Sequence, residues 1–532
     1  MPVAARRTHV PDILDCLAQL SNDEVPTPPR LARAMLDLLP KKVWSNPDYK
    51  WLDPCCKSGA VLREVAARLL VGLEAWEPNF AKRREHIFRN MLYGTSVTEL
   101  TGQVVRRSVY CSHDASGEQS VVRFKHAGGN LPFVPTPHNF GQDGTSTKCA
   151  VCGAPKELER GVGRENYAYA FIHGTYPTKE MSGMKFDVIV GNPPYQIDSD
   201  GNTRTKPVYQ LFIERAIEAN PRYVLMITPS RWFTGGLGLD EYRNRMIHDR
   251  RMRALVDNPK LFDCFPGVEI KGGISYFLWD RNHNGDCDFS TRIDGSIISA
   301  IKRDLRDGDG VLIRDNEAAA IIKKVLKKIS ARVEGEFGPQ VPFGLRTNYR
   351  HAAEKPFRGS IPVVFGTKIG YVRSDQLERN HDFVDKWKVL IPMAGDGHGR
   401  ETSYVIGEPI AVAPGSACTQ TYFIAGMFDT PGETENYAHY LATKFVRFLV
   451  LQRKTTQHLT PDRFRFVPML DMKTRWTDEK LYKKFGLTAE EREYIERSIN
   501  PRTVNLSLDS PIPMSHLPGG NKHRSGVRED KE

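Results

Sequence analysis

The segment Asn192-Pro193-Pro194-Tyr195 carries the side chains best suited to chemistry. The amide oxygen of Asn192 and the carbonyl of Pro193 can both accept hydrogen bonds from an exocyclic amino group, and Tyr195 can stack on the ring that bears it. The two prolines exclude both helix and ladder pairing, so this backbone is stiff. The pattern predicts a site that grips a flat, amino-bearing base; a plain Pro-rich turn is the alternative.

A strand must position this segment. Residues Phe186–Val190 are mostly apolar and β-rich and are followed by Gly191, which predicts a short buried strand. Asn192 and Tyr195 then project at the carboxyl end of that strand. Ligands bind at this edge in open α/β sheets.

A second candidate site lies in Lys50–Leu62, KWLDPCCKSGAVL. The order strand, small-residue turn, helix is that of a nucleotide-binding α/β unit, although a generic strand–helix turn has the same pattern. Gly59 lets the backbone approach a ligand, and the helix N-terminus that follows favours negative charge. Asp53, at the strand end, can instead meet a cationic group. Upstream, Thr27 is expected to cap a helix that begins at Pro28, or to lie in a loop over a cofactor.

A candidate metal site lies in the polar stretch 107–165. Cys149-Ala-Val-Cys152-Gly153 has the spacing of a metal knuckle, with two thiolates on one tight turn. A closed zinc site needs two more ligands, and Cys111 is a candidate for one of them. Three histidines compete for the other: His113, His126 and His138. We favour His138, which lies close upstream of the knuckle; a redox pair or inert thiols are the alternatives.

Composition bounds the class of protein. The 532 residues exceed a single core and predict two to four domains, and 40% apolar with 26% charged residues is typical of a soluble globular protein. We expect no membrane span, because no run of about 18 apolar residues occurs. The nine scattered cysteines fit a reducing cytoplasm rather than a disulfide framework. The net charge of +11 favours a polyanionic partner.

The order of these motifs resembles that of the gamma-group N6-adenine DNA methyltransferases, and more narrowly the methylases related to type IIG restriction–modification enzymes. The resemblance rests on Thr27-Pro28-Pro29, Asp53–Gly59 and Asn192–Tyr195, and covers roughly residues 20–280. It implies an α/β fold with a doubly wound, mostly parallel, Rossmann-like sheet. It also implies transfer of a methyl group from S-adenosylmethionine to N6 of a flipped adenine in duplex DNA.

The resemblance further implies roles for individual residues. The cofactor would be held by Thr27, Pro28, Asp53, Pro54, Cys55, Gly59, Glu99, Ile172 and His173. The family has an acidic residue after the second strand to hold the ribose; here that slot falls on Ser96 or Thr98, and Glu99 is the nearest carboxylate. The catalytic set would be Asn192, Pro193, Pro194 and Tyr195, with Phe265 stacking on the flipped base. A core aromatic is the alternative for Phe265.

We expect a methyltransferase domain in two parts, an insertion, a second domain and a tail. The ranges are 1–106 with 166–300, a zinc-ribbon-like insertion at 107–165, a mixed α+β target-recognition domain at 311–498, and a disordered tail at 499–532. A long helix after residue 432 carries four basic residues expected to contact DNA phosphates: Lys444, Arg447, Arg453 and Lys454. Thr477 and Thr488 are expected helix N-caps.

Two other functions use the same motifs. An RNA or protein-glutamine methyltransferase can also hold an amino or amide group with N-P-P-Y. A restriction component would in addition cut DNA, and Asp263 with Glu269 and Lys271 imitates a nuclease metal triad, although the spacing is short. A separate restriction endonuclease or helicase subunit is the partner that the resemblance suggests besides duplex DNA.

Overall fold

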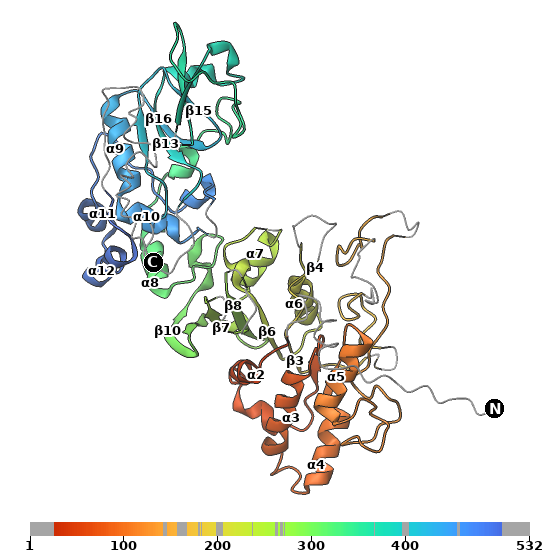
Figure 1. Ribbon diagram of the computed structural model, residues 1–532. Helices are drawn as coiled ribbons and strands as arrows, with labels where there is room; N and C mark the ends of the chain where they lie inside the picture. Colours follow the sequence, from red (N-terminus) through yellow and green to blue (C-terminus); the bar gives the residue numbers. More distant parts are fainter. Residues whose placement is uncertain are drawn as a thin grey trace, which may run out of the picture. The chain divides into compact units, whose positions relative to one another are not determined.

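The chain forms two compact units, Met1–Leu312 and Ile313–Glu532, in a computed structural model (Figure 1). Each unit is built on its own sheets and core. The structure describes residues 26–141, 146–156, 168–178, 181, 183–197, 206–236, 238–260, 264–265, 270, 272–366, 368–395, 404–454 and 458–502. The expected triad residues Asp263, Glu269 and Lys271, and most of the expected tail, lie outside these ranges.

The first unit is organised by an eight-stranded sheet of order β10-β9-β7-β8-β6-β3-β1-β2. The strands are β1 (Trp51–Asp53), β2 (Leu92–Gly94), β3 (Val188–Gly191), β6 (Tyr223–Pro229), β7 (Met252–Asn258), β8 (Ile274–Asp280), β9 (Cys287–Ile293) and β10 (Ser296–Arg303). Strands β2, β1, β3 and β6 are parallel neighbours, whereas β8 pairs antiparallel with both β6 and β7. This α/β sheet confirms the predicted fold class.

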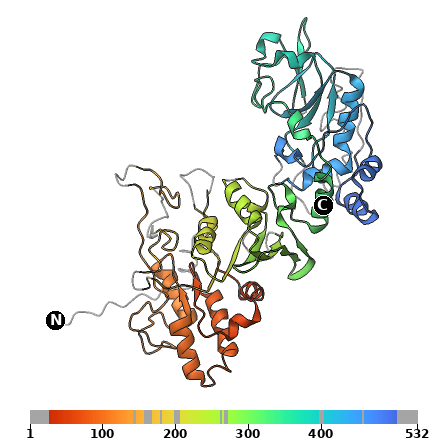
Figure 2. The same cartoon turned by 180° about the vertical axis from the view of Figure 1, so that it is seen from behind.

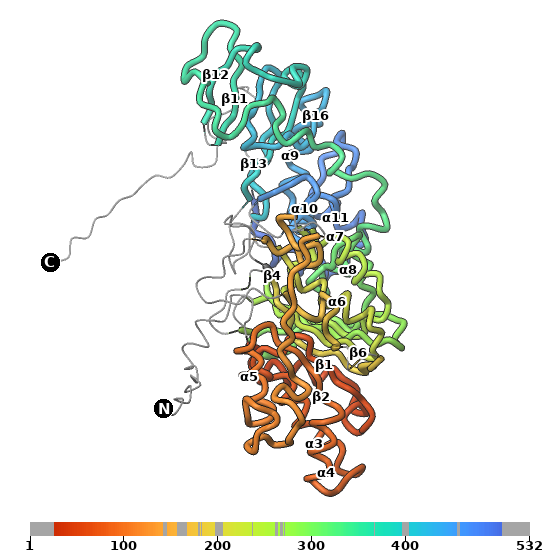
Figure 3. The backbone as a smooth tube through the Cα atoms, turned by 90° about the vertical axis from the view of Figure 1, so that its right-hand side faces the viewer, coloured from red at the N-terminus to blue at the C-terminus, as the bar shows by residue number. Residues whose placement is uncertain are grey.

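Both faces of the sheet are covered by helices, as a doubly wound fold requires. Successive strand residues point to opposite faces, so Val188 and Val190 belong to one core while Ile189 belongs to the other. The first core packs against α2 (Pro29–Leu36), α3 (Ala60–Gly72) and α5 (Glu99–Tyr110). The second packs against α6 (Tyr209–Glu218) and α7 (Asp240–His248). The tube view shows α3, α4 and α5 with β1 and β2 (Figure 3).

Short elements complete this unit. They are η1 (Lys41–Ser45), α4 (Phe80–His86), the π-helical η2 (Ile87–Met91), β4 (Gln196–Ile197), β5 (Lys206–Pro207), η4 (Ser230–Phe233) and η5 (Leu305–Gly308). Within the described residues, no helix is both long and apolar enough to cross a membrane.

The stretch between α5 and β3 consists of turns and isolated bridges in its described residues. Its first loop is held by Arg106 of α5, which donates to the carbonyl oxygens of His113 (2.6 Å) and Leu131 (3.2 Å). Further along, Lys148 and Pro155 form an antiparallel bridge around the cysteine knuckle. The first loop is therefore organised by hydrogen bonds from α5, away from the knuckle.

The second unit contains two three-stranded sheets with helices α8 to α12. One sheet has the order β12-β11-β15 and the other β14-β13-β16. Their strands are β11 (Ile361–Phe365), β12 (Lys368–Val372), β13 (Trp387–Pro392), β14 (Ile410–Val412), β15 (Ala417–Cys418) and β16 (Tyr422–Phe428). The helices are α8 (Asn316–Leu326), α9 (Pro431–Ala442), α10 (Lys444–Leu451), α11 (Asp478–Phe485) and α12 (Ala489–Ser498), with short turns η6 (Val333–Glu336), η7 (Ser374–Gln376), η8 (His381–Asp385) and η9 (Pro461–Phe464). Helix α9 packs on β13, β14 and β16, and is visible from behind in Figure 2.

The prediction of one long basic helix after residue 432 is wrong. Thr443 has an extended backbone, with ψ of 151°, and separates α9 from α10. Arg447 is only 1% exposed and donates to the Ala442 carbonyl at 2.9 Å. Arg453 donates to the Asp462 carbonyl, also at 2.9 Å. Both guanidinium groups therefore donate to carbonyl oxygens inside the unit, as burial of a charged group requires, and do not form an exposed face for DNA phosphates.

Candidate active site and cysteine–histidine cluster

The N-P-P-Y segment begins directly after Gly191, the last residue of β3, and lies in the protein interior. Asn192 is 2% exposed, and its Nδ2 donates to Thr27 Oγ1 at 3.2 Å. The expectation that Thr27 caps the next helix is wrong, because Pro28 is the N-cap and α2 begins at Pro29. The Thr27 hydroxyl can therefore hold the carboxamide of Asn192 across 165 residues of sequence.

The D-P-C-C-K-S-G turn after β1 lies against the N-P-P-Y segment. Asp53 is 1% exposed, and its Oδ1 accepts a hydrogen bond from the Cys55 amide at 3.0 Å. A Cβ atom at Gly191 would stand 2.7 Å from the same oxygen. Glycine is therefore required where the carboxyl of β1 meets the end of β3. Gly59 has φ of 76°, the left-handed conformation that glycine adopts at little cost, and it is the N-cap of α3. Pro54, Pro193 and Pro194 are buried in the same region.

Burial controls the ionisation of Asp53. Loss of hydration raises the pKa of its carboxyl from 3.8 to about 7, although the Cys55 amide and the charge of Lys57 act in the opposite direction. The carboxyl therefore changes charge near neutral pH, and a cationic ligand would favour its ionised form.

Two aromatic rings lie together beside this turn. The rings of Tyr195 and Phe265 are 6.4 Å apart between centroids and inclined at 74°. Phe265 is 2% exposed, so it also belongs to the core, as the alternative interpretation expected. The Tyr195 hydroxyl is buried and has no hydrogen-bond partner among the residues that the structure describes.

The loop after β2 uses its polar residues differently from the sequence-based expectation. Glu99 forms an ion pair with Arg106, with 3.1 Å between Oε1 and Nη2, and Thr98 caps α5 by accepting from the Thr101 amide. Ser96 is 4% exposed, and its hydroxyl has no hydrogen-bond partner in the described part of the chain. Of the three candidates for a ribose contact, Ser96 alone is buried with an unpaired hydroxyl.

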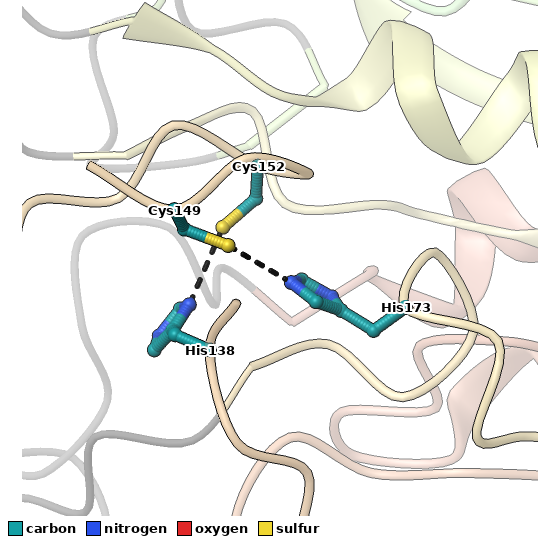
Figure 4. Close-up of side chains that lie close together, drawn as sticks. All are labelled: His138, Cys149, Cys152 and His173. Atoms are coloured by element: carbon teal, nitrogen blue, oxygen red, sulfur yellow. Dashed lines mark hydrogen bonds between the residues drawn. The ribbon is translucent and has the colours of Figure 1, made fainter. Parts of the chain in front are cut away.

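The neighbouring residues Ile172 and His173, both expected to hold the cofactor, lie in different environments. Ile172 packs against the second core of the sheet. His173 instead joins His138, Cys149 and Cys152 in one cluster, whose ligand atoms all lie within 4.8 Å of one another (Figure 4). The structure thus places the His173 imidazole beside the cysteine knuckle, which suits a metal ligand.

The four ligand atoms of the cluster lie close enough together to hold a metal ion. Cys149 Sγ lies 3.4 Å from His173 Nε2, and Cys152 Sγ lies 3.4 Å from His138 Nδ1 (Figure 4). Around zinc, sulfur and nitrogen ligands at about 2.3 and 2.0 Å are separated by about 3.5 Å. The remaining ring nitrogen of His173 lies 3.0 Å from the Tyr169 carbonyl, a contact that fixes the orientation of the imidazole.

Backbone and side-chain contacts around the knuckle act on the Cys149 thiol. Cys149 accepts from the Asn139 amide at 3.4 Å, and Gly153 adopts the left-handed conformation with φ of 73°. Burial raises the pKa of the Cys149 thiol, but hydrogen bonds from the Cys152 backbone amide and from His173 outweigh it and lower the pKa to about 5. A thiolate is the ligand form of cysteine.

Cys111 lies outside this cluster, which corrects the expected ligand set. It is exposed and follows α5 in the left-handed conformation, with φ of 61°. The loop that follows Cys111 is held against α5 by Arg106, which donates to the His113 carbonyl. His138 and the two knuckle cysteines are in the cluster as expected, and His173 takes the fourth position.

A largely parallel α/β sheet whose neighbouring strand ends carry D-P-C-C-K-S-G and N-P-P-Y defines a methyltransferase of the Rossmann-like class. The family model described as Eco57I restriction-modification methylase matches residues 90–265. An "Uncharacterized adenine-specific methylase" of Mycoplasma pneumoniae is 36% identical over 327 residues, which are 55% of this chain and 76% of that protein. The chain belongs to this family of adenine-specific methylases.

Solved structures of restriction–modification enzymes are similar over most of the chain. The DrdV–DNA complex matches 90% of this chain with 12% identity and a TM-score of 0.44. The type IIG restriction endonuclease BpuSI matches 89% with 10% identity and a TM-score of 0.39. The chain spans 57% and 66% of the lengths of these two proteins.

Proposed function

We propose that this protein transfers a methyl group from S-adenosylmethionine to N6 of a flipped adenine in duplex DNA, as part of a restriction–modification or phage-defence system. The observation that carries the proposal is the contact between the two motifs. The carboxyl of Asp53 lies against Gly191, directly before Asn192. Methyl donor and acceptor amine would thus meet at adjacent strand ends, where α/β sheets bind ligands.

The acceptor side of the reaction is assigned to N-P-P-Y. The Asn192 amide oxygen and the Pro193 carbonyl accept hydrogen bonds from the adenine amino group, which moves the nitrogen toward tetrahedral geometry. An amino group within the base stack cannot reach the site, so the base must be flipped out, and Tyr195 with Phe265 would stack on it. Positioning then supplies most of the catalysis, because the cofactor brings a methyl group already activated by positive charge.

The cofactor side is assigned to residues around β1 and β2. Asp53 suits the ammonium group of the methionine part, and the Gly59 turn brings backbone close to it. The unpaired, buried hydroxyl of Ser96 supports a contact with the ribose in place of Glu99, whose carboxylate is paired with Arg106. Thr27 orients Asn192 from its own side of the site.

The cluster of His138, Cys149, Cys152 and His173 is proposed to hold one structural zinc. Two thiols and two imidazoles whose ligand atoms all lie within 4.8 Å of one another suit this ion, and four protein ligands would leave no position for a catalytic water. Zinc would join the knuckle to the turn that leads into β3. Elemental analysis of the purified full chain should give about one zinc. The content should fall in Cys149→Ser and His173→Ala but not in the matched control Cys111→Ser; equal loss in all three, or no zinc in the wild type, would refute the site.

Duplex DNA binding is assigned to a basic edge of the second unit, in place of α10. Four exposed cations lie there with the partly exposed Phe357: Arg346, Arg350, Lys355 and Arg358. A bridge between Ala353 and Tyr371 attaches this segment to β12. Exposed cations interleaved with aromatic residues suit contacts to phosphates and bases. A separate endonuclease or helicase subunit is the further partner proposed.

The proposed reaction is tested by tritium transfer from labelled S-adenosylmethionine to duplex DNA, RNA and protein in parallel. Label should enter duplex DNA and be recovered as N6-methyladenine, and Asn192→Ala should abolish it. Label in RNA or in protein glutamine would favour the alternative methyltransferases instead. Magnesium-dependent nicking by the pure protein would favour a bifunctional restriction component.

A further inference from the structure

Ser230 follows the last residue of β6 and is bonded to two other segments of the first unit. The residue is only 3% exposed. Its backbone N–H donates to the Gly273 carbonyl at 2.9 Å, and its hydroxyl donates to Asp257 Oδ1 at 2.8 Å. Strand β8 lies between β6 and β7, so the hydroxyl reaches past one strand to a carboxyl on the next.

The two residues that Ser230 contacts lie at the two ends of one connection. Asp257 is the residue before the last of β7, and Gly273 directly precedes β8. The ends of this connection meet, because a Cβ atom at Gly273 would clash with the Asn258 carbonyl oxygen. The segment between them carries Phe265. Ser230 therefore joins both ends of the segment that carries this ring.

The middle of the connection reaches the candidate active site. The rings of Phe265 and Tyr195 lie 6.4 Å apart between centroids. Cys264 and Ile270 pack with Phe265 against the first core of the sheet. Stacking on a base requires ring contact, so its strength depends on where the Phe265 ring stands. A shift at the anchored ends of the connection would move this ring relative to Tyr195.

Burial alone does not explain the bond between Ser230 and Asp257. Thr228 and Ser275 are both 0% exposed, yet their hydroxyls have no hydrogen-bond partner among the residues that the structure describes. These two residues pair across β6 and β8, and Ser275 also pairs with Asp257 on β7. The same part of the sheet thus accommodates buried hydroxyls without such a bond, whereas the hydroxyl of Ser230 is directed to a carboxyl.

We propose that Ser230 is a positioning residue for the methyl acceptor. Its bonds to Asp257 and Gly273 hold the connection so that Phe265 stacks on the flipped adenine. The inference rests on the proposed function. Ser230 lies outside the residues assigned to the cofactor, so its loss should slow methyl transfer and leave binding of S-adenosylmethionine unchanged.

The test is a double-mutant cycle in the full chain, with tritium transfer to unmodified genomic duplex DNA as the readout. Ser230→Ala should lower the single-turnover rate by roughly 10-fold, as expected for loss of a hydrogen bond to a buried carboxyl. Phe265→Ala removes the stacking ring and should lower the rate by roughly 10- to 100-fold. The double variant should be no slower than Phe265→Ala, because both changes remove the same stacking contact. The matched control Ser275→Ala, which removes a neighbouring buried hydroxyl, should retain the wild-type rate.

A second readout separates positioning from a general loss of structure. Calorimetry should give the same Kd for S-adenosylmethionine in Ser230→Ala and in the wild type. A weaker Kd, a wild-type rate in Ser230→Ala, or effects of Ser230→Ala and Phe265→Ala that multiply in the double variant would each overturn the inference. If Ser230→Ala does not fold, Ser230→Cys takes its place in the cycle, because a thiol fills similar space but donates only weakly. A wild type that transfers no label would contradict the proposed function, and this inference with it.

Discussion

Replacing Asp53 with asparagine should stabilise the free protein at neutral and alkaline pH. The folded unit holds this carboxyl with its pKa raised from 3.8 to about 7 by burial. Between these values the unfolded chain is ionised while the folded chain keeps its proton. Stability is therefore greatest at low pH, is lost as pH rises from 3.8 toward 7, and levels off above 7.

The size of the effect follows from this pKa. Each pH unit within the window costs about 1.4 kcal/mol, so roughly 3 kcal/mol of stability is lost between pH 5 and the plateau. Asparagine has no charge to bury, and its amide oxygen can still accept from the Cys55 amide. Asp53→Asn should thus gain about 3 kcal/mol relative to the wild type on going from pH 5 to pH 8.

The assay is urea denaturation of the full chain at both pH values, following the transition of the first unit. Comparing the variant with the wild type at each pH cancels the other titrating groups. Asp37→Asn, which replaces an exposed carboxylate on the same unit, serves as the control. A difference between Asp53→Asn and the wild type that is the same at pH 5 and pH 8 would refute the buried-carboxyl argument. Asp53→Asn should also bind S-adenosylmethionine more weakly, so its gain in stability would come with a loss of function.

Four further outcomes are expected. Binding of S-adenosylmethionine should strengthen as pH rises to about 7, and below this pH it should release protons, because the ammonium group of the ligand favours ionised Asp53. Calorimetry in buffers of different ionisation enthalpy measures the protons released. Binding that does not depend on pH would count against the contact. Thr27→Val should lower the methylation rate with little change in cofactor affinity, because only the Asn192 carboxamide loses its partner; a changed Kd would argue for a direct cofactor contact. Arg350→Ala or Lys355→Ala should weaken DNA binding and reduce its salt dependence by about one phosphate contact each, unlike the exposed control Lys483→Ala, in salt-titrated gel shifts. A fragment of residues 1–312 should still bind S-adenosylmethionine but lose site-specific DNA binding, and retained site preference in competition gel shifts would refute the role of the second unit.

Local motifs made much of the fold predictable from the sequence. N-P-P-Y and the turn after Asp53 each depend on a few adjacent residues whose backbone preferences are strong. The helix caps Thr477 and Thr488 are confirmed for the same reason. Contacts that join distant segments were not predictable. Thr27 bonds Asn192 rather than capping its own helix, and nothing in the local pattern distinguishes the two roles.

The errors in the candidate sites have the same origin. Spacing alone favoured Cys111 and did not point to His173, because the path of the insertion depends on Arg106 and on carbonyls that it contacts. The break at Thr443 depends on Asp478, whose carboxylate accepts from the amides of Lys444 (3.1 Å) and Phe445 (2.8 Å) at the start of α10. Asp478 acts from 34 residues away, but Thr443 also caps α10 locally, because its hydroxyl accepts from the Val446 amide at 3.3 Å, and a threonine at that point is a signal that the sequence does offer.

The central claim is that Asn192 and its neighbours methylate adenine in DNA. The most direct measurement is long-read sequencing of DNA from cells that express the full chain, with Asn192→Ala expressed at the same level as the control. The account predicts N6-methyladenine at one short sequence motif, with the variant reduced by at least 100-fold in methylation rate, as expected when a transition-state hydrogen bond is lost. Absence of modified adenine in the wild type, or an unchanged pattern in Asn192→Ala, would contradict it.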